Sequence, residues 1–351
     1  MHSYSELTQA RTDLALQEEV YRPSAFWAES SEQIVQELEA SGIDQFRSLP
    51  KALGFFVPTY GSPGNSFSQK QADGLKSWLQ HEYGEGKKPN LALEQFLSGS
   101  SQALSDYRVL LASDDVNKYP YLHQFTESGV GNPIEQFAFD GRNFSRSSLN
   151  YLLGLAMLKK HLQPQDPLRN VLEIGGGFGT LGEILAHSGI KDQRYIDIDI
   201  PPTSFVAQYY LTQVLGAKNV IGYSDTKDKT EIRIESLPQA SVLCSWQIEK
   251  LQGDIDLFVN FISFQEMEPH IVENYLNHVD RLGSRWILLR NMREGKQVKK
   301  THSVGVKTPI KSDDYLAMLP KYELVEKNVF PFGYKTVDGF HSELLLLKRN
   351  D

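Results

Sequence analysis

A glycine-rich turn between an apolar strand and a helix constrains this chain more than any other segment. Residues 171–182 read VLEIGGGFGTLG, an apolar run that contains one carboxylate, Glu173, followed by a turn and the start of a helical pattern. The turn has glycines at three alternate positions, Gly175, Gly177 and Gly179. Glycines let the backbone bend sharply and let a ligand approach without interference from a Cβ atom. The segment therefore predicts a nucleotide-type ligand pocket at the end of a strand.

The sequence pattern changes near residue 170. Residues 1–165 read as helices joined by punctuated loops, whereas short apolar runs alternate with helical segments farther along the chain. At 351 residues the chain is long enough for a second unit beside one α/β domain. We expect a mainly helical N-terminal region over 1–165, which forms a wall or lid and leaves oligomerisation open, and an α/β ligand-binding domain over 166–351.

Seven runs in the second region have strand character. They are 171–174, 194–198, 242–245, 257–262, 286–290, 322–329 and 342–348. The last two have no helical pattern between them, so we expect them to be antiparallel neighbours. The fold class predicted is α/β, a Rossmann-like seven-stranded sheet with an antiparallel last strand. This ending is typical of methyltransferase-type sheets, whereas dinucleotide-binding dehydrogenases keep a sixth parallel strand.

The glycines alone leave two cofactors open, because residues 177–182 also satisfy the dinucleotide pattern G-x-G-x-x-G. Three features favour S-adenosylmethionine, with S-adenosylhomocysteine as product. Glu173 precedes the first glycine by two residues, a large segment precedes the motif, and the sheet is expected to end antiparallel. We expect Glu173, Gly175, Gly177 and Gly179 to bind the cofactor, and a dehydrogenase that binds NAD is the less favoured interpretation.

Two aspartates end the second strand of the domain. Asp199 lies 20 residues beyond Gly179 and Asp197 lies 18 beyond it. At this distance a carboxylate at the next strand end can accept hydrogen bonds from both ribose hydroxyls. Side chains alternate along a strand, so both aspartates point to one face and only one lies at the tip. We expect both in the cofactor site and favour Asp199 for the ribose.

Several segments together resemble one known family. Beside the glycine turn, they are Asp-Ile-Pro-Pro at 199–202, Ala-Gln-Tyr-Tyr-Leu at 207–211, Ser-Phe-Gln-Glu-Met at 263–267 and, less specifically, 21–27. Over about residues 125–348 the chain resembles the sugar O-methyltransferases, a family of class I methyltransferases. The resemblance implies methyl transfer from S-adenosylmethionine to a sugar, nucleotide-sugar or glycan acceptor. It also implies a role in polysaccharide or glycosylated metabolite biosynthesis.

The resemblance assigns further cofactor contacts. In this fold the end of the third strand supplies adenine contacts, here Ser245, Trp246 and Gln247. Trp246 can stack on the purine or serve only in packing. The fourth strand should run past the methyl donor, which adds Asn260 and Ser263 to the expected site.

Methyl transfer to a hydroxyl needs a base that takes the proton as the bond forms. Glu266 is the first candidate because it follows the strand nearest the methyl donor, and a structural role for it stays open. Related small-molecule O-methyltransferases place a histidine close by, where this chain has Gln265. His341, near the expected last turn, is the second candidate.

Polar residues near the expected pocket are candidates for acceptor binding. They are Arg142, Asn150 and Tyr151 before the domain, Gln265 after the fourth strand, and Arg290 and Asn291 after the fifth. Ligand sites in such sheets lie at the carboxyl ends of the strands. These groups can bind sugar hydroxyls or a phosphate.

Composition excludes several classes of protein. The formal net charge of −8 lacks the positive field of a general nucleic-acid binder, and no apolar run is long enough to cross a bilayer. The one cysteine, Cys244, fits a reducing compartment, and we expect a cytoplasmic protein. No spacing of histidines or paired carboxylates predicts a metal site.

Two further functions stay open. The chain could methylate an oxygen or nitrogen of an aromatic metabolite, because 18 Phe and 16 Tyr can serve a substrate slot as well as a core. It could also be a subunit that binds the cofactor without catalysis and positions a partner.

Overall fold

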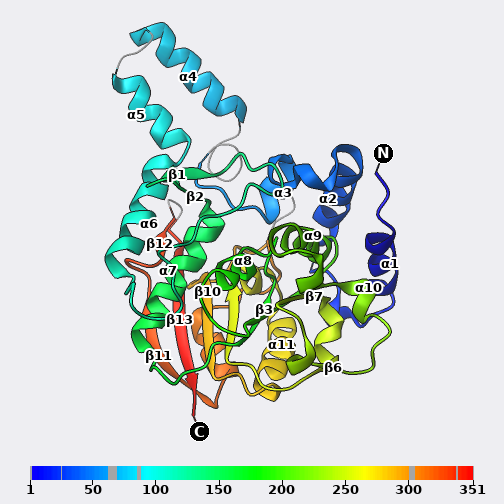
Figure 1. Ribbon diagram of the computed structural model, residues 1–351. Helices are drawn as coiled ribbons and strands as arrows, with labels where there is room; N and C mark the ends of the chain where they lie inside the picture. The colour runs from blue at the N-terminus through cyan, green and yellow to red at the C-terminus, as the bar shows by residue number, and fades with distance from the viewer. Residues whose placement is uncertain are drawn as a thin grey trace.

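The computed structural model describes residues 2–24, 26–61, 69–84, 88–299, 305–336 and 339–350. A central sheet carries helices on both faces, and further helices of the N-terminal region lie above it in Figure 1. The α-helices in chain order are α1 Ser5–Leu14, α2 Ala28–Ser41, α3 Pro50–Phe55, α4 Gln69–Tyr83, α5 Lys88–Leu97, α6 Ser100–Ser113, α7 Arg146–His161, α8 Thr180–Ala186, α9 Thr203–Leu215, α10 Tyr223–Thr226, α11 Pro269–Arg281 and α12 Ser312–Met318.

The main sheet has the strand order β11-β13-β10-β9-β3-β4-β7-β5, with β12 paired to β13. Its strands are β3 Asn170–Ile174, β4 Arg194–Asp199, β5 Val220–Ile221, β7 Ala240–Cys244, β9 Leu257–Phe261, β10 Trp286–Met292, β11 Tyr322–Asn328, β12 Tyr334–Lys335 and β13 His341–Arg349. Strands β10, β9, β3, β4, β7 and β5 run parallel, and β13 is antiparallel to both β10 and β11. Two small sheets lie outside it, β1 Phe137–Phe139 with β2 Arg142–Phe144, and β6 Ile232–Arg233 with β8 Leu251–Gln252.

The predicted α/β class and the antiparallel finish are confirmed. All seven expected strands form, as β3, β4, β7, β9, β10, β11 and β13. The main sheet of the described residues nevertheless has nine strands, because two short ones were not foreseen. Strand β5 extends the edge beside β7, and β12 pairs with the start of β13. Each has two residues, too few for a periodic apolar signal.

Alternation along the strands divides the core into two layers. On β13, Leu344 and Leu346 join the cluster with α7, α8 and α9, whereas Leu345 and Leu347 join the cluster with α11 and α12. This is the expected result when both faces of a sheet are covered by helices. The helices cover both faces of the sheet but leave the carboxyl ends of the parallel strands uncovered. Ligands bind at these ends in such sheets.

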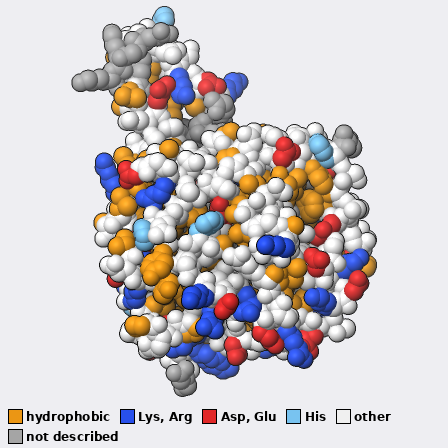
Figure 2. Space-filling view, in the orientation of Figure 1, with side chains coloured by type: hydrophobic (Ala, Val, Ile, Leu, Met, Phe, Trp, Pro, Cys, Tyr) orange, Lys and Arg blue, Asp and Glu red, His pale blue; other side chains and the backbone are white. Residues whose placement is uncertain are grey.

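The N-terminal region shares the core of the α/β domain. Buried residues of α2, α3 and α6 belong to the same hydrophobic cluster as the strands, and α1 packs into the cluster on the opposite face. Helices α4 and α5 project from the body (Figure 1), and hydrophobic side chains are visible among charged ones on this projection in Figure 2. Those with the largest exposed fractions there are Phe96, Leu91 and Trp78.

A buried ion cluster ties the N-terminal region to the glycine turn. The Arg47 guanidinium lies 2.6 Å from a Glu135 carboxylate oxygen and 3.1 Å from one of Glu127, and all three side chains are buried. The same guanidinium lies over the ring of Phe178, inside the glycine turn, at 4.8 Å. The N-terminal region is therefore part of the framework that holds the turn.

Within the described residues, no helix combines the length and the apolar character needed to cross a membrane.

Candidate active site

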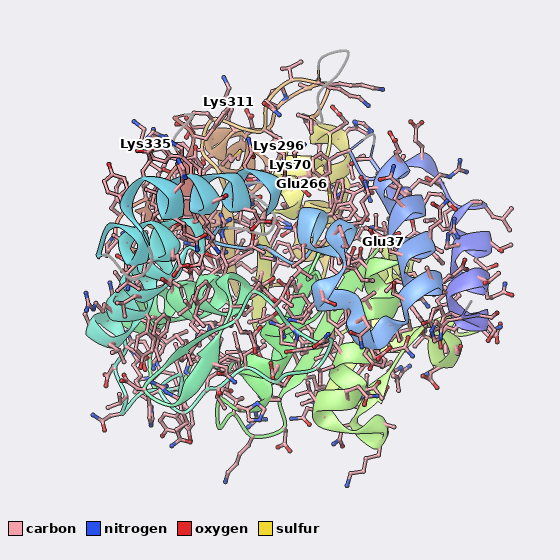
Figure 3. All side chains as sticks on the ribbon, turned by 90° about the horizontal axis from the view of Figure 1, so that it is seen from above. Glu37, Lys70, Glu266, Lys296, Lys311 and Lys335 are labelled. Carbon is pink, nitrogen blue, oxygen red and sulfur yellow. The ribbon has the colours of Figure 1, made fainter. Side chains whose placement is uncertain are left out.

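A cavity of about 1230 Å³ opens at the carboxyl ends of β3, β4, β9 and β10. Its walls come from these strand ends, from α7, and from N-terminal residues between Val20 and Ser105. Ligand pockets commonly measure about 300–1000 Å³, so this one has room for a cofactor and an acceptor together. Figure 3 looks down on the molecule from above and labels three residues that line the cavity, of which Glu266 and Lys296 lie side by side and Lys335 lies farther to the left.

The glycine turn forms one wall of the cavity. Gly175 and Gly177 have φ angles of +73° and +65°, a region that L side chains rarely adopt. A Cβ atom at Gly175 would lie 2.2 Å from Ser263 Oγ, so the turn and the loop after β9 pack too closely for any side chain. Gly175 and Gly177 both line the cavity, whereas Gly179 caps the start of α8 and packs against Leu211.

The two aspartates of β4 have different surroundings. Asp197 is fully buried, and its carboxylate accepts a hydrogen bond from the Gly176 N–H at 3.2 Å. Asp199 lies at the strand tip and lines the cavity, where it accepts from the Ile200 N–H at 2.7 Å. The first residue thus holds the turn in place, and the second presents a carboxylate to a ligand.

The Asp199 carboxylate is poorly solvated. Burial raises its pKa to about 8, although backbone hydrogen bonds from Ile200 and Gly177 oppose the rise. Hydrogen bonds from hydroxyl groups stabilise such a carboxylate, because they replace the hydrogen bonds to water that it has lost.

Glu173 does not line the cavity. It is fully buried, and its two carboxylate oxygens accept hydrogen bonds of 2.6 Å from the hydroxyls of Tyr151 and Tyr195. Burial raises the pKa of Glu173 to about 7, against the effect of both hydroxyls. Tyr151 does line the cavity and stacks on Phe261, with the ring centroids 4.9 Å apart. Glu173 therefore acts on the cavity from beneath, by holding the Tyr151 hydroxyl and by raising the pKa of Asp199.

A network of amides fixes the loop after β9. Asn260 donates to the Ile174 carbonyl at 2.9 Å and to Ser263 Oγ at 2.6 Å, and it accepts from Asn291 Nδ2 at 3.0 Å. Asn291 in turn accepts from the Gln265 N–H. Ser263, Gln265 and Ile174 line the cavity, whereas Asn260 and Asn291 do not. Asn260 and Asn291 were both predicted to contact ligands. They are instead buried, and their hydrogen bonds hold Ser263 and Gln265 in place.

Ile262 has a strained backbone at the end of β9. Its φ of +74° is rare for a β-branched residue, and its side chain lines the cavity. Its N–H donates to the Arg290 carbonyl at 2.7 Å, which fixes this conformation against β10. Such strain is found at sites where the surrounding structure determines the backbone.

Glu266 lines the cavity and is held by two side chains. One carboxylate oxygen lies 2.7 Å from Lys296 Nζ, and the other accepts a hydrogen bond of 3.1 Å from Trp27 Nε1. The Ser24 hydroxyl donates to its backbone carbonyl. Glu266 is 6% exposed, and its carboxylate is paired and fixed in orientation at the cavity wall.

His341 does not line the cavity, although the residue after it, Ser342, does. Its Nδ1 lies 2.6 Å from a Glu294 carboxylate oxygen and 2.7 Å from Arg293 Nη2. These partners hold the ring outside the cavity. Of the two candidate bases, only Glu266 reaches the cavity.

The residues after β7 also turn away from the cavity. The Ser245 hydroxyl donates to the Tyr21 carbonyl, and Gln247 accepts from the Cys244 N–H and donates to Thr226. Trp246 packs edge to face on Tyr223 in the core. All three therefore have structural partners in place of the adenine contacts that the sequence predicted.

The acceptor candidates divide in the same way. Asn150 and Arg290 line the cavity and contact each other, with Arg290 Nη1 2.9 Å from Asn150 Oδ1. Arg142 lies outside it, on β2, where it donates to the His123 carbonyl and to the Tyr107 hydroxyl.

The sequence reasoning missed many cavity residues, and four of them bear on its chemistry. Arg146, Lys296, Tyr334 and Phe55 all line the cavity. Arg146 follows the capping serine of α7, Ser145, and this was a signal that could have placed it beside Asn150. Lys296 and Tyr334 follow β10 and β11 by several residues, and nothing in their local sequence marks them.

Among the described side chains, no group of three or more His, Cys, Asp or Glu residues could hold a metal ion. The adjacent Asp313 and Asp314 lie in the first turn of α12, and Asp314 accepts from the Lys311 N–H as a helix cap.

Comparisons with known proteins give distant structural matches. No family model matches the sequence, and no curated protein matches it. The magnesium protoporphyrin IX methyltransferase of Synechocystis PCC 6803, solved with bound S-adenosylmethionine, is 13% identical with a TM-score of 0.38, over 58% of this chain and 79% of that one.

Two other solved structures match at a similar distance. A methyltransferase of Leishmania major is 10% identical with a TM-score of 0.38, over 58% of this chain and 74% of that one. The 1,6-didemethyltoxoflavin-N1-methyltransferase of Burkholderia thailandensis is 14% identical with a TM-score of 0.37, over 56% and 77%. At this distance the matches indicate no substrate for this chain. The fold class rests on the strand order and on the antiparallel β13.

Proposed function

We propose that this chain is an S-adenosylmethionine-dependent O-methyltransferase that acts on a sugar hydroxyl. The observation that carries the proposal is that the glycine turn, Asp199 and Glu266 all face one cavity. The turn and the aspartate suit a nucleoside, and the glutamate, on the loop after β9, suits a proton acceptor.

The residues present fit this cofactor. Gly175 and Gly177 offer a wall without side chains, and Asp199 offers a poorly solvated carboxylate to two ribose hydroxyls. Tyr151 and Ser263 would flank the methionine end. When bound, the cofactor supplies a methyl group on a positively charged sulfur, and its product is S-adenosylhomocysteine.

Glu266 would accept the proton of the acceptor hydroxyl. Its carboxylate is acceptor-only when ionised, and Lys296 and Trp27 fix its orientation toward the cavity. A base that is already oriented in this way does not need to change its position when the proton moves. The lysine also keeps the carboxylate from being an unpaired buried charge.

The mixed lining of the cavity supports a sugar acceptor. Asn150, Gln265 and Ser342 offer hydrogen bonds for hydroxyl groups, beside the rings of Phe26, Trp27 and Phe55. The centroids of these three rings lie 5.7 to 6.0 Å from one another. An aromatic surface with polar groups around it suits a ligand that has an apolar face and a polar rim.

The same ring cluster favours a second candidate, methylation of an aromatic metabolite. Aromatic rings pair in edge-to-face and offset arrangements, and the Phe26–Trp27–Phe55 cluster could extend to a substrate ring. The two candidates share the cofactor and the base and differ in the acceptor.

The test is a transfer assay with two acceptor panels. The purified protein is incubated with S-adenosylmethionine and either sugars and nucleotide sugars or phenolic metabolites, and formation of S-adenosylhomocysteine is followed. Turnover that depends on a sugar supports the proposal, and turnover only with phenols supports the second candidate. Cofactor binding without turnover on either panel would instead indicate a non-catalytic subunit.

A further inference from the structure

Two arginine side chains line the cavity without an acidic partner. Arg290 is 1% exposed and donates to neutral oxygens of Asn150, Phe332 and Ser342. Arg146 donates to the Thr59 carbonyl and the Tyr334 hydroxyl. Over the part of the chain that the structure describes, no carboxylate lies within 4 Å of either guanidinium, and the buried Nε of Arg146 has no hydrogen-bond partner.

The surroundings of the pair are electropositive. Burial opposes ionisation of the Tyr334 phenol, yet the charges of Arg146 and Arg290 and hydrogen bonds from Arg146 and Ser342 hold its pKa below the ordinary value. Asp106 is an acid whose charge acts on both arginines, and it accepts a hydrogen bond from the Tyr60 hydroxyl at 2.6 Å. Burial raises the pKa of Asp106, and its carboxylate is hydrogen-bonded to Tyr60 and lies beyond ion-pair distance of both arginines.

The whole cavity carries excess positive charge in an acidic protein. Its charged lining residues are the cations Arg22, Arg146, Arg290, Lys296 and Lys335 and the carboxylates Asp199 and Glu266. The chain as a whole has a formal charge of −8. Figure 3 shows Lys296 beside Glu266 and Lys335 farther to the left in the same view. A cation excess confined to one cavity favours a negatively charged ligand.

The arginine pair lies away from the expected nucleoside end. Asp199 is on β4 and Arg290 on β10, and β3 and β9 lie between these strands. Neighbouring strands are about 4.8 Å apart, so the two positions are separated by roughly 14 Å across the sheet. Arg146 precedes Tyr151 by five residues of α7, which is about 7.5 Å along the helix axis. The pair therefore lies on the side of the cavity that is left for an acceptor.

We propose that Arg146 and Arg290 bind an oxyanion group of the acceptor, a phosphate or a carboxylate, so that the methylated sugar is an anionic one. This inference rests on the proposed function and narrows its acceptor class. Guanidinium groups suit such anions because their donors form paired, charge-assisted hydrogen bonds. The unpartnered Nε of Arg146 is a donor that such a group would satisfy.

The test uses calorimetric titration of the full chain saturated with S-adenosylhomocysteine. The probes are inorganic pyrophosphate for the phosphate source and glucuronate for the carboxylate source. The first variant is Arg146→Met. The second is the conservative Arg290→Lys, because Arg290 also forms structural hydrogen bonds with Asn150, Phe332 and Ser342. Arg194→Met is the matched control, since Arg194 lies at the opposite end of β4 and donates to the Leu237 carbonyl.

Support requires that one probe binds the wild type and the control, and that Arg146→Met weakens this binding about tenfold or more. Affinity for S-adenosylhomocysteine should stay within about twofold. No binding of either probe, or binding that Arg146→Met leaves unchanged, would overturn the inference.

A third result would assign the pair to the cofactor and overturn the inference too. Arg146→Met would then weaken the binding of S-adenosylhomocysteine but not that of methylthioadenosine, which lacks the carboxylate. Failure of the wild type to bind S-adenosylhomocysteine at all would be a failure of the proposed function, and the first titration distinguishes it from the other outcomes.

Discussion

The carboxylate of Glu266 lies 2.7 Å from Nζ of Lys296, and both side chains line the cavity that Asp199 and the glycine turn also line. The ion pair joins the loop after β9 to the segment after β10, and it fixes a carboxylate at the cavity wall. The proposed proton transfer depends on this relationship.

Replacement of Glu266 by glutamine should lower turnover about 100-fold or more, because an amide cannot take the acceptor proton. The amide can still accept from Trp27 Nε1, so the cavity wall should keep its shape. The measurement is steady-state turnover, with affinity for S-adenosylhomocysteine as the control. Unchanged turnover would remove Glu266 from the role of base.

Affinity for adenosine should rise with pH through the titration of Asp199. Its pKa of about 8 means that the carboxyl is protonated below this pH and becomes an acceptor for both ribose hydroxyls above it. We expect about a tenfold gain between about pH 6.5 and about pH 8.5. Adenosine is the ligand of choice because the methionine amino group of the cofactor titrates in the same range, near about 8. Asp199→Asn should bind weakly with a flat pH profile, and a similar rise in that variant would assign the effect to another group.

Ile262→Gly should be more stable than Ile262→Ala, the reverse of the usual order. Both substitutions remove the packing of the side chain, but only glycine relieves the backbone at φ +74°. The expected difference in the free energy of unfolding is about 1 kcal/mol, measured by urea denaturation. An alanine variant as stable as the glycine variant would show that this backbone carries no strain.

Arg47→Met should destabilise the fold by about 3–5 kcal/mol, because it leaves Glu127 and Glu135 buried without their cation. The matched control is Arg233→Met, whose ion pair with Glu231 has both side chains exposed, the arginine at 67% and the glutamate at 46%. The control should leave the free energy of unfolding almost unchanged. Equal losses in the two variants would contradict a structural role for the buried cluster.

The sheet and the Asp199 position were predictable because their signals are local. Apolar runs marked the seven long strands, and the carboxyl ends of parallel strands must meet at one edge, which placed Asp199 near the glycine turn. The confirmed antiparallel β13 followed from the missing helical pattern before it.

The other site residues depend on partners far along the chain. Ser245 was expected at the adenine, but its hydroxyl donates to Tyr21, which is 224 residues away. His341 was expected near the acceptor, but Glu294 and Arg293 hold it outside the cavity. Lys296 pairs with Glu266 across 30 residues of sequence. No local pattern reports such pairings, because they form only when the N-terminal region and the last strands pack on the sheet.

The most direct test of the central claim is calorimetric titration with S-adenosylhomocysteine and, separately, NAD, on the wild type and on Asp199→Ala. The proposed function predicts binding of S-adenosylhomocysteine in the micromolar range, weakened by the substitution, and no comparable binding of NAD. Preference for NAD, or no binding of S-adenosylhomocysteine, would contradict the account.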